Sequence, residues 1–91
     1  MTKEETFNYC KESFKNFIIP LYDQIKNSED KLNFESTLTF ACRVESNELK
    51  KITQFGTLLT KSIAHYGTEL ISDLRKVFEE VVPLERRIEW N

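Results

Sequence analysis

A run of apolar residues spaced three and four positions apart extends from residue 46 to residue 82 of this 91-residue chain. An α-helix turns about 100° per residue, so side chains with this spacing lie on one face of a helix. The run predicts a long apolar helical face that another part of the chain must cover. Its members are Leu49, Ile52, Gly56, Leu59, Ile63, Tyr66, Leu70, Leu74, Val77 and Val81.

Two glycines lie within this run, and a proline follows it. Gly56 lies on the apolar face, where the missing side chain allows a neighbouring segment to approach, at a helix cost of about 1 kcal/mol. Gly67 predicts the end of one helix, with Thr68 as the N-cap of the next. The last helix is expected from Thr68 to Val81, because Pro83 disfavours the helical conformation at Val82.

The N-terminal segment predicts one helix, over about residues 2–26, that bends near Pro20. Thr2 and Glu5 have the spacing of a capping box. Pro20 lacks an N–H group and its ring clashes with the carbonyl four residues back, so it bends or breaks a helix. The apolar residues keep one helical phase across Pro20, which favours a single kinked helix; they are Phe7, Cys10, Phe14, Phe17, Ile18, Leu21, Tyr22 and Ile25.

Residues 31–45 are compatible with either a strand pair or a helix. Leu32, Phe34, Leu38 and Phe40 alternate with polar neighbours, which is typical of strands. The same residues Phe34 and Leu38 also lie on one helical face, in phase with the apolar run that follows. We favour the helix, because no glycine, proline or Asn-Gly pair is present to form a tight hairpin turn.

The predicted fold is therefore a single all-α domain over 1–91, a small antiparallel bundle of three to four helices. The middle helix is expected over 29–65, capped by Ser28, and is either continuous or broken near Ser46. A middle helix of about 35 residues at 1.5 Å per residue is longer than its neighbours and favours a homodimer. The alternative is an α+β fold with a short strand pair within 31–45.

Charge and composition exclude several classes of protein. The net charge is −2, and basic and acidic side chains are nearly balanced along the chain, so no extended surface for nucleic acid is predicted. The longest uninterrupted apolar run is the three residues before Pro20, too short to span a membrane. The N-terminus lacks the layout of a signal peptide. We expect a soluble, cytoplasmic protein without a membrane partner.

The residues that carry chemistry in other proteins are sparse and scattered here. His65 is the only histidine, and a Ser62–His65 pair without an orienting carboxylate is a poor nucleophile arrangement. Cys10 and Cys42, with 31 residues between them, lie on apolar faces and are expected to be buried, reduced thiols. One histidine and two distant cysteines do not form a metal site. We expect no catalytic residues, cofactor or metal.

Apolar residues that lie off the main helical face predict a protein interface. In the helical interpretation, Leu32, Phe40 and Val44 point away from the core, and Ile88 and Trp90 add apolar surface at the C-terminus. A bundle of three helices has too few elements to cover two faces of one helix, and exposed apolar surface typically marks a protein interface. We expect a non-enzymatic protein-interaction module that acts as a regulator, adaptor or inhibitor of another protein, as a homodimer. If residues 31–45 form the strand pair instead, Phe40 points into the core.

Two basic doublets support an alternative function. In this alternative the protein is a nucleic-acid-associated regulator that binds through a local basic patch, formed by Arg75-Lys76 and Arg86-Arg87. Acidic residues interleave with both doublets, which is more typical of a solvated surface. Nucleic acid is therefore the less favoured partner.

Overall fold

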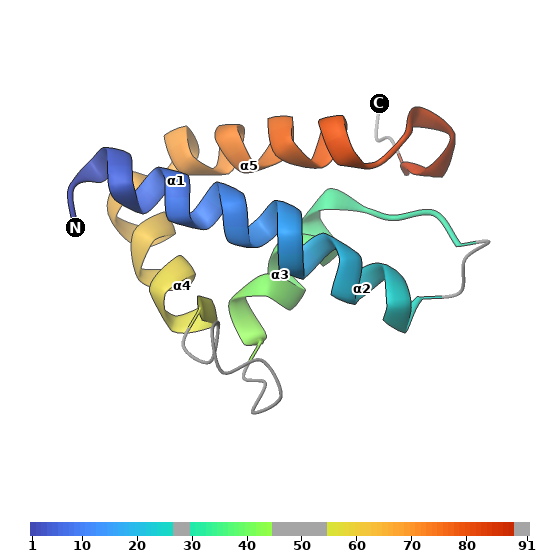
Figure 1. Ribbon diagram of the computed structural model, residues 1–91, viewed down its shortest axis with the longest axis horizontal. Helices are drawn as coiled ribbons and strands as arrows, with labels where there is room; N and C mark the ends of the chain where they lie inside the picture. The colour runs from blue at the N-terminus through green and yellow to red at the C-terminus, as the bar shows by residue number, and fades with distance from the viewer. Residues whose placement is uncertain (27–29, 45–54, 89–91) are drawn as a thin grey trace.

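Helices form almost all of the structure, which is a computed structural model that describes residues 1–26, 30–44 and 55–88 (Figure 1). The predicted all-α bundle is confirmed. The strand pair within 31–45 is not formed, because residues 34–43 are helical. The elements in chain order are α1 (Lys3–Ser13), a π-helical turn (Phe14–Ile18), α2 (Ile19–Ile25), α3 (Phe34–Arg43), α4 (Phe55–Tyr66), α5 (Thr68–Val81) and a 3-10 turn (Leu84–Arg86).

The helices form three consecutive segments that alternate in direction, and we call these the legs of the fold: α1 with α2, then α3 with α4, then α5 (Figure 1). In Figure 1, α1 and α5 lie side by side and run in the same direction, and the Lys3 Nζ–Glu69 Oε1 ion pair of 2.7 Å joins their first turns. Helices α3 and α4, drawn below α1 in Figure 1, meet at an angle and bring the chain back to the end of the molecule at which α1 begins. First and third legs that run parallel are expected when consecutive legs are antiparallel.

The single helix expected over 29–65 is wrong. Its start is Phe34, because the side chain of Asn33 accepts a hydrogen bond of 2.9 Å from the Ser36 N–H and caps α3 there. The predicted cap, Ser28, lies outside the described residues, as does the predicted break at Ser46. Helix α3 ends at Arg43, since Val44 is extended. The argument for a homodimer from the length of this helix therefore no longer applies.

The N-terminal helix continues through Pro20, as predicted, by means of a π-helical turn. The capping box is present: the Glu5 N–H donates to Thr2 Oγ1 and the Thr2 N–H donates to Glu5 Oε1, each at 3.1 Å. Just before Pro20, the Ile19 N–H donates to the Phe14 carbonyl, five residues back. The wider turn rearranges the carbonyls that a proline ring would meet in a regular helix.

The π-helical turn shifts which residues face the core. It adds one residue to a turn, so every side chain beyond it rotates by about 100° relative to a regular helix. Ile19, which is not among the residues of the predicted apolar face, is only 3% exposed, whereas Ile25, which is among them, is 63% exposed. The core face of this helix is therefore formed by Phe7, Cys10, Phe14, Ile18 and Ile19.

Aromatic rings join the three legs at the centre of the core. Phe14 and Phe34 meet edge to face with centroids 6.2 Å apart, and Phe34 meets Phe78 in the same way at 5.6 Å. These contacts link the N-terminal helix to α3 and α3 to α5. Phe34 is thus fixed from two sides, which holds the first turn of α3 in place.

Helix α5 agrees with its prediction in extent but not in its cap. It covers Thr68–Val81, and Val82 is extended, as expected for the residue before Pro83. Gly67 has φ 63° and ψ −136° and itself occupies the N-cap position, so the assignment of Thr68 as the cap is wrong. No helix in the described part of the chain is long and apolar enough to cross a bilayer.

The C-terminal segment folds back onto the residue before the α3 cap. The Leu32 N–H donates to the Arg86 carbonyl at 2.7 Å and the Ile88 N–H donates to the Leu32 carbonyl at 3.0 Å, which forms one isolated parallel bridge. The Arg86 guanidinium also pairs with the Asp23 carboxylate at 2.8 Å and donates to the Asp30 carbonyl at 2.8 Å. The connection between α2 and α3 is thereby tied to the end of the chain.

Candidate interaction surface

The outward side of α3, together with α2, lines a shallow hollow of about 460 Å³. Helix α3 turns Phe34, Thr37 and Ala41 into the core, so the residues on its opposite side face solvent. We call this surface the α3 face. It consists of Tyr22, Glu35, Ser36, Thr39, Phe40 and Arg43.

Two aromatic side chains lie on the α3 face. The ring centroids of Tyr22 and Phe40 are 4.9 Å apart, with the ring planes inclined by 37°. Both side chains are half-buried, so each covers part of the other while part of both remains accessible. The Lys26 ammonium lies 5.4 Å from the Tyr22 centroid, within the range of a cation–π contact. Aromatic residues surrounded by polar ones are typical of the centre and rim of a protein interface.

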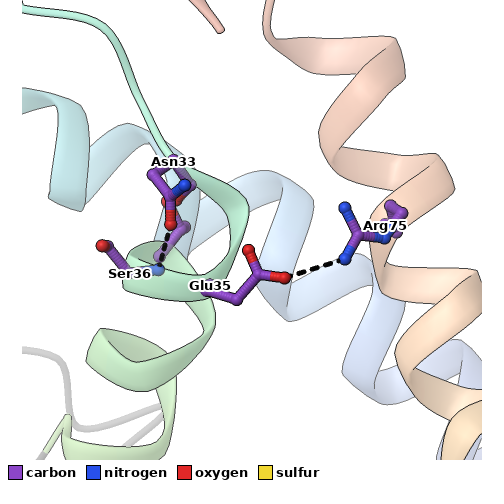
Figure 2. A network of polar contacts seen from close by, with 5 residues as sticks. Asn33, Glu35, Ser36 and Arg75 are labelled. Atoms are coloured by element: carbon purple, nitrogen blue, oxygen red, sulfur yellow. Dashed lines mark hydrogen bonds and ion pairs between the residues drawn. The ribbon is translucent and has the colours of Figure 1, made fainter. Parts of the chain in front are cut away.

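Opposite charges lie at the two ends of α3. Glu35 is in its first turn and Arg43 in its last, the arrangement that the helix dipole favours. Figure 2 shows Glu35 Oε1 reaching Arg75 Nη2 on α5 at 3.0 Å. The Arg75 guanidinium in turn lies 4.4 Å from the centroid of the Phe34 ring. These contacts hold Glu35 at one end of the α3 face.

A second hollow, of about 360 Å³, lies between α3, α5 and the C-terminal segment. Its described lining includes two arginines and two glutamates, whose charges balance. Its apolar lining comes mostly from buried rings, and Ile88 is 42% exposed at its edge. The full lining is Phe34, Glu35, Arg75, Phe78, Glu79, Arg87 and Ile88.

The residues predicted to form an interface differ in their burial and location in the structure. Leu32 and Val44 are 2% and 6% exposed, so the expectation that they point away from the core is wrong. Both lie outside α3 in extended backbone, where helical phase does not apply, and Leu32 is covered by the C-terminal segment. Phe40 is half-buried on the α3 face and Ile88 lies at the second hollow. Trp90 lies outside the described residues.

The basic doublets are engaged within the chain. Arg75 pairs with Glu35, and Arg86 pairs with Asp23. Lys76 lines a groove of about 300 Å³ between α1 and α5 in which Asp73 and Glu80 also lie. The structure therefore does not assemble these residues into one cationic surface.

The residues considered for catalysis are not brought together. His65 is exposed on α4, and the Ser62 hydroxyl donates to the Leu58 carbonyl of its own helix at 2.7 Å. Cys10 is fully buried, and this burial raises the pKa of its thiol. Cys42 is a second free thiol, half-buried on α3. Within the described ranges, no group of three histidine, cysteine or acidic residues is placed to hold a metal ion.

Sequence reasoning missed five members of the α3 face: Tyr22, Glu35, Ser36, Thr39 and Arg43. Ser36, Thr39 and Arg43 recur at steps of three and four, so a polar stripe opposite the buried side of α3 could have been recognised once the helix was accepted. Tyr22 could not, because its position depends on the π-helical turn, for which the sequence has no periodic signal.

Comparison with protein-family models, with curated proteins and with solved structures finds no match to this chain. The function is therefore argued from the surface itself.

Proposed function

We propose that this protein is a small, non-enzymatic, cytoplasmic interaction module that regulates, adapts or inhibits another protein through the α3 face, and that it works as a homodimer. The observation that supports the proposal is the Tyr22–Phe40 pair, whose rings remain partly accessible within a polar rim. Aromatic residues dominate the binding energy of protein interfaces because they bury large apolar area with few rotatable bonds.

The anchoring of α3 also supports this function. Asn33 caps its first turn, the Phe34 ring is fixed between Phe14 and Phe78, and Gly56 of α4 packs directly against its last turn. A surface held on a rigid element loses little conformational entropy on binding, so more of the contact energy contributes to affinity.

Nucleic-acid binding is the weaker candidate. Two of its four proposed cations, Arg75 and Arg86, already pair with carboxylates of the same chain. Binding of DNA or RNA by basic residues releases counterions and therefore weakens steeply with salt. Affinity for nucleic acid that is absent, or that does not change with salt concentration, would exclude this alternative.

Site-specific photo-crosslinking in the native host tests the proposed function. A photoreactive amino acid at position 39 replaces an exposed residue at the centre of the α3 face, and the same amino acid at Ser72 of α5 is the matched control. The proposal predicts a discrete protein adduct from position 39 and not from position 72. Mass spectrometry then shows whether the adduct contains a second copy of this chain, a different protein or both.

The proposal is wrong if position 39 gives no protein adduct while the variant chain is folded and present at normal abundance. Adducts of equal yield from both positions would also contradict it, since contact would then not be confined to the α3 face.

A further inference from the structure

The charges of the α3 face are arranged symmetrically about its centre. Glu35 lies four residues before Thr39 and Arg43 lies four residues after it, so the two charges are about 12 Å apart along the axis at 1.5 Å per residue. Both are exposed and both line the same hollow. A surface with opposite charges at equal distances from its midpoint matches a copy of itself turned by 180°.

We infer that a second copy of this chain binds the α3 face, with the two α3 helices antiparallel and a twofold axis near Thr39. In this arrangement, Arg43 of each copy faces Glu35 of the other, so the contact contains two equivalent ion pairs. This inference rests on the proposed function and specifies how its homodimer forms. Because the dimer covers the α3 face, the regulated protein binds this face in exchange with the second copy.

The other residues of the α3 face fit this arrangement. Ser36 and Thr39 are small and exposed, so two α3 helices can approach closely at the axis. The Tyr22–Phe40 pair flanks the axis in each copy and supplies apolar area. The Arg75–Glu35 pair does not prevent the contact, because a carboxylate accepts hydrogen bonds from more than one guanidinium group.

The size of the face sets the strength of the dimer. Helix α3 has 10 residues and is therefore about 15 Å long. A contact of this length, with a few residues of α2, lies at the small end of specific interfaces. We therefore expect a dimer that dissociates on dilution, with Kd in the micromolar range or weaker.

Charge reversal provides a sharp test, measured by sedimentation velocity over a concentration series. In a dimer of the Glu35→Arg variant, Arg43 of each copy faces the arginine introduced at position 35 of the other. In a dimer of the Arg43→Glu variant, Glu35 of each copy faces the glutamate introduced at position 43 of the other. Each variant should raise Kd by at least about tenfold, because like charges then meet twice. An equimolar mixture of the two variants restores both ion pairs and should sediment as a dimer. The double variant Glu35→Arg/Arg43→Glu should dimerise alone.

Two controls keep the result interpretable. Thr39→Arg places a bulky cation at the axis and should abolish dimerisation; Ser72→Arg on α5 should not. Circular dichroism melts verify that each variant is folded, which is expected because all these positions are exposed.

A wild-type chain that stays monomeric over the whole series would overturn this inference. So would dimers that are unaffected by the single reversals, or folded single variants whose mixture stays monomeric. A monomeric wild type would also remove the homodimer from the proposed function. None of these results would overturn the binding of another protein through the α3 face, which a crosslink from position 39 to a different protein would still support. The absence of any adduct at position 39 would overturn the proposed function instead.

Discussion

Gly56 of α4 lies directly against the backbone of Cys42 in α3. A Cβ atom at position 56 would lie 2.5 Å from the Cys42 carbonyl oxygen, 2.9 Å from its carbonyl carbon and 3.1 Å from the Val44 carbonyl oxygen. All three are backbone atoms, which cannot move aside as the end of a flexible side chain can. The close approach of α3 and α4 therefore requires glycine at this position.

Gly56→Ala should destabilise the fold. Alanine favours helix over glycine by about 1 kcal/mol, but forcing an extra methyl into a packed contact typically costs about 1–3 kcal/mol. We expect a net loss in the free energy of unfolding, measured by urea denaturation. Thr57→Ala, at the next and exposed position of α4, is the control and should change stability little. Equal stability of the wild type and Gly56→Ala would contradict the close packing of α3 on α4.

The register shift after the π-helical turn predicts opposite effects for two isoleucines. Ile19→Ala should cost about 2–4 kcal/mol of unfolding free energy, since this side chain is 3% exposed. Ile25→Ala should change stability by less than about 0.5 kcal/mol, since this side chain is 63% exposed. Chemical denaturation of the two variants measures both. A regular α-helix through Pro20 would reverse the order of the two losses.

The backbone conformation of Gly67 predicts that L-alanine and D-alanine at this position affect stability differently. At φ 63° and ψ −136°, an L-residue is strained, although no atom lies within 4 Å of where its Cβ would be. Gly67→Ala should therefore cost about 1–3 kcal/mol. D-alanine at the same position, introduced by chemical synthesis, adds the same methyl group without the strain and should be tolerated. If L- and D-alanine gave equal thermal stabilities, the cost would not come from backbone conformation.

The capping box predicts how stability depends on pH. The Thr2 backbone N–H, and next its hydroxyl, hold the pKa of the Glu5 carboxyl below its usual value of 4.5. The folded state therefore binds this proton less readily than the unfolded state, so the stabilisation is present above the unfolded pKa and is lost as the pH falls through the folded pKa. The stability advantage of the wild type over Glu5→Gln should shrink between about pH 6 and about pH 3.

Glu4→Gln is the control for the pH prediction, because it removes one negative charge from the same helix turn without removing the capping box. Thermal melts of the three proteins across the pH range provide the measurement. A wild-type advantage over Glu5→Gln that does not change with pH would show that the Glu5 carboxylate does not stabilise the folded N-terminus.

The elements that sequence predicts well are those fixed by local signals. The capping box at Thr2 and the extent of α5 before Pro83 follow from interactions within a few residues, and the close approach at Gly56 is indicated by a glycine on an apolar helical face. The all-α class follows from periodicity, which also favours helix over strand at Phe34 and Leu38.

The elements that sequence misses depend on contacts between distant segments. The burial of Leu32 arises from hydrogen bonds with Arg86 and Ile88, more than fifty residues away. The burial of Ile19 arises from the π-helical turn, which local spacing does not reveal. The expectation that the predicted interface residues point away from the core is therefore wrong for Leu32 and Val44, while Phe40 and Ile88 keep part of their surface exposed.

The most direct measurement of contact at the α3 face is a two-dimensional amide NMR spectrum of the wild-type chain, recorded from micromolar to millimolar concentration. Self-association through this face predicts concentration-dependent shifts that cluster at Tyr22, Ser36, Thr39 and Arg43 and leave the α1–α5 groove around Lys11 unchanged. Shifts confined to the α1–α5 groove, or a spectrum that does not change with concentration, would contradict it.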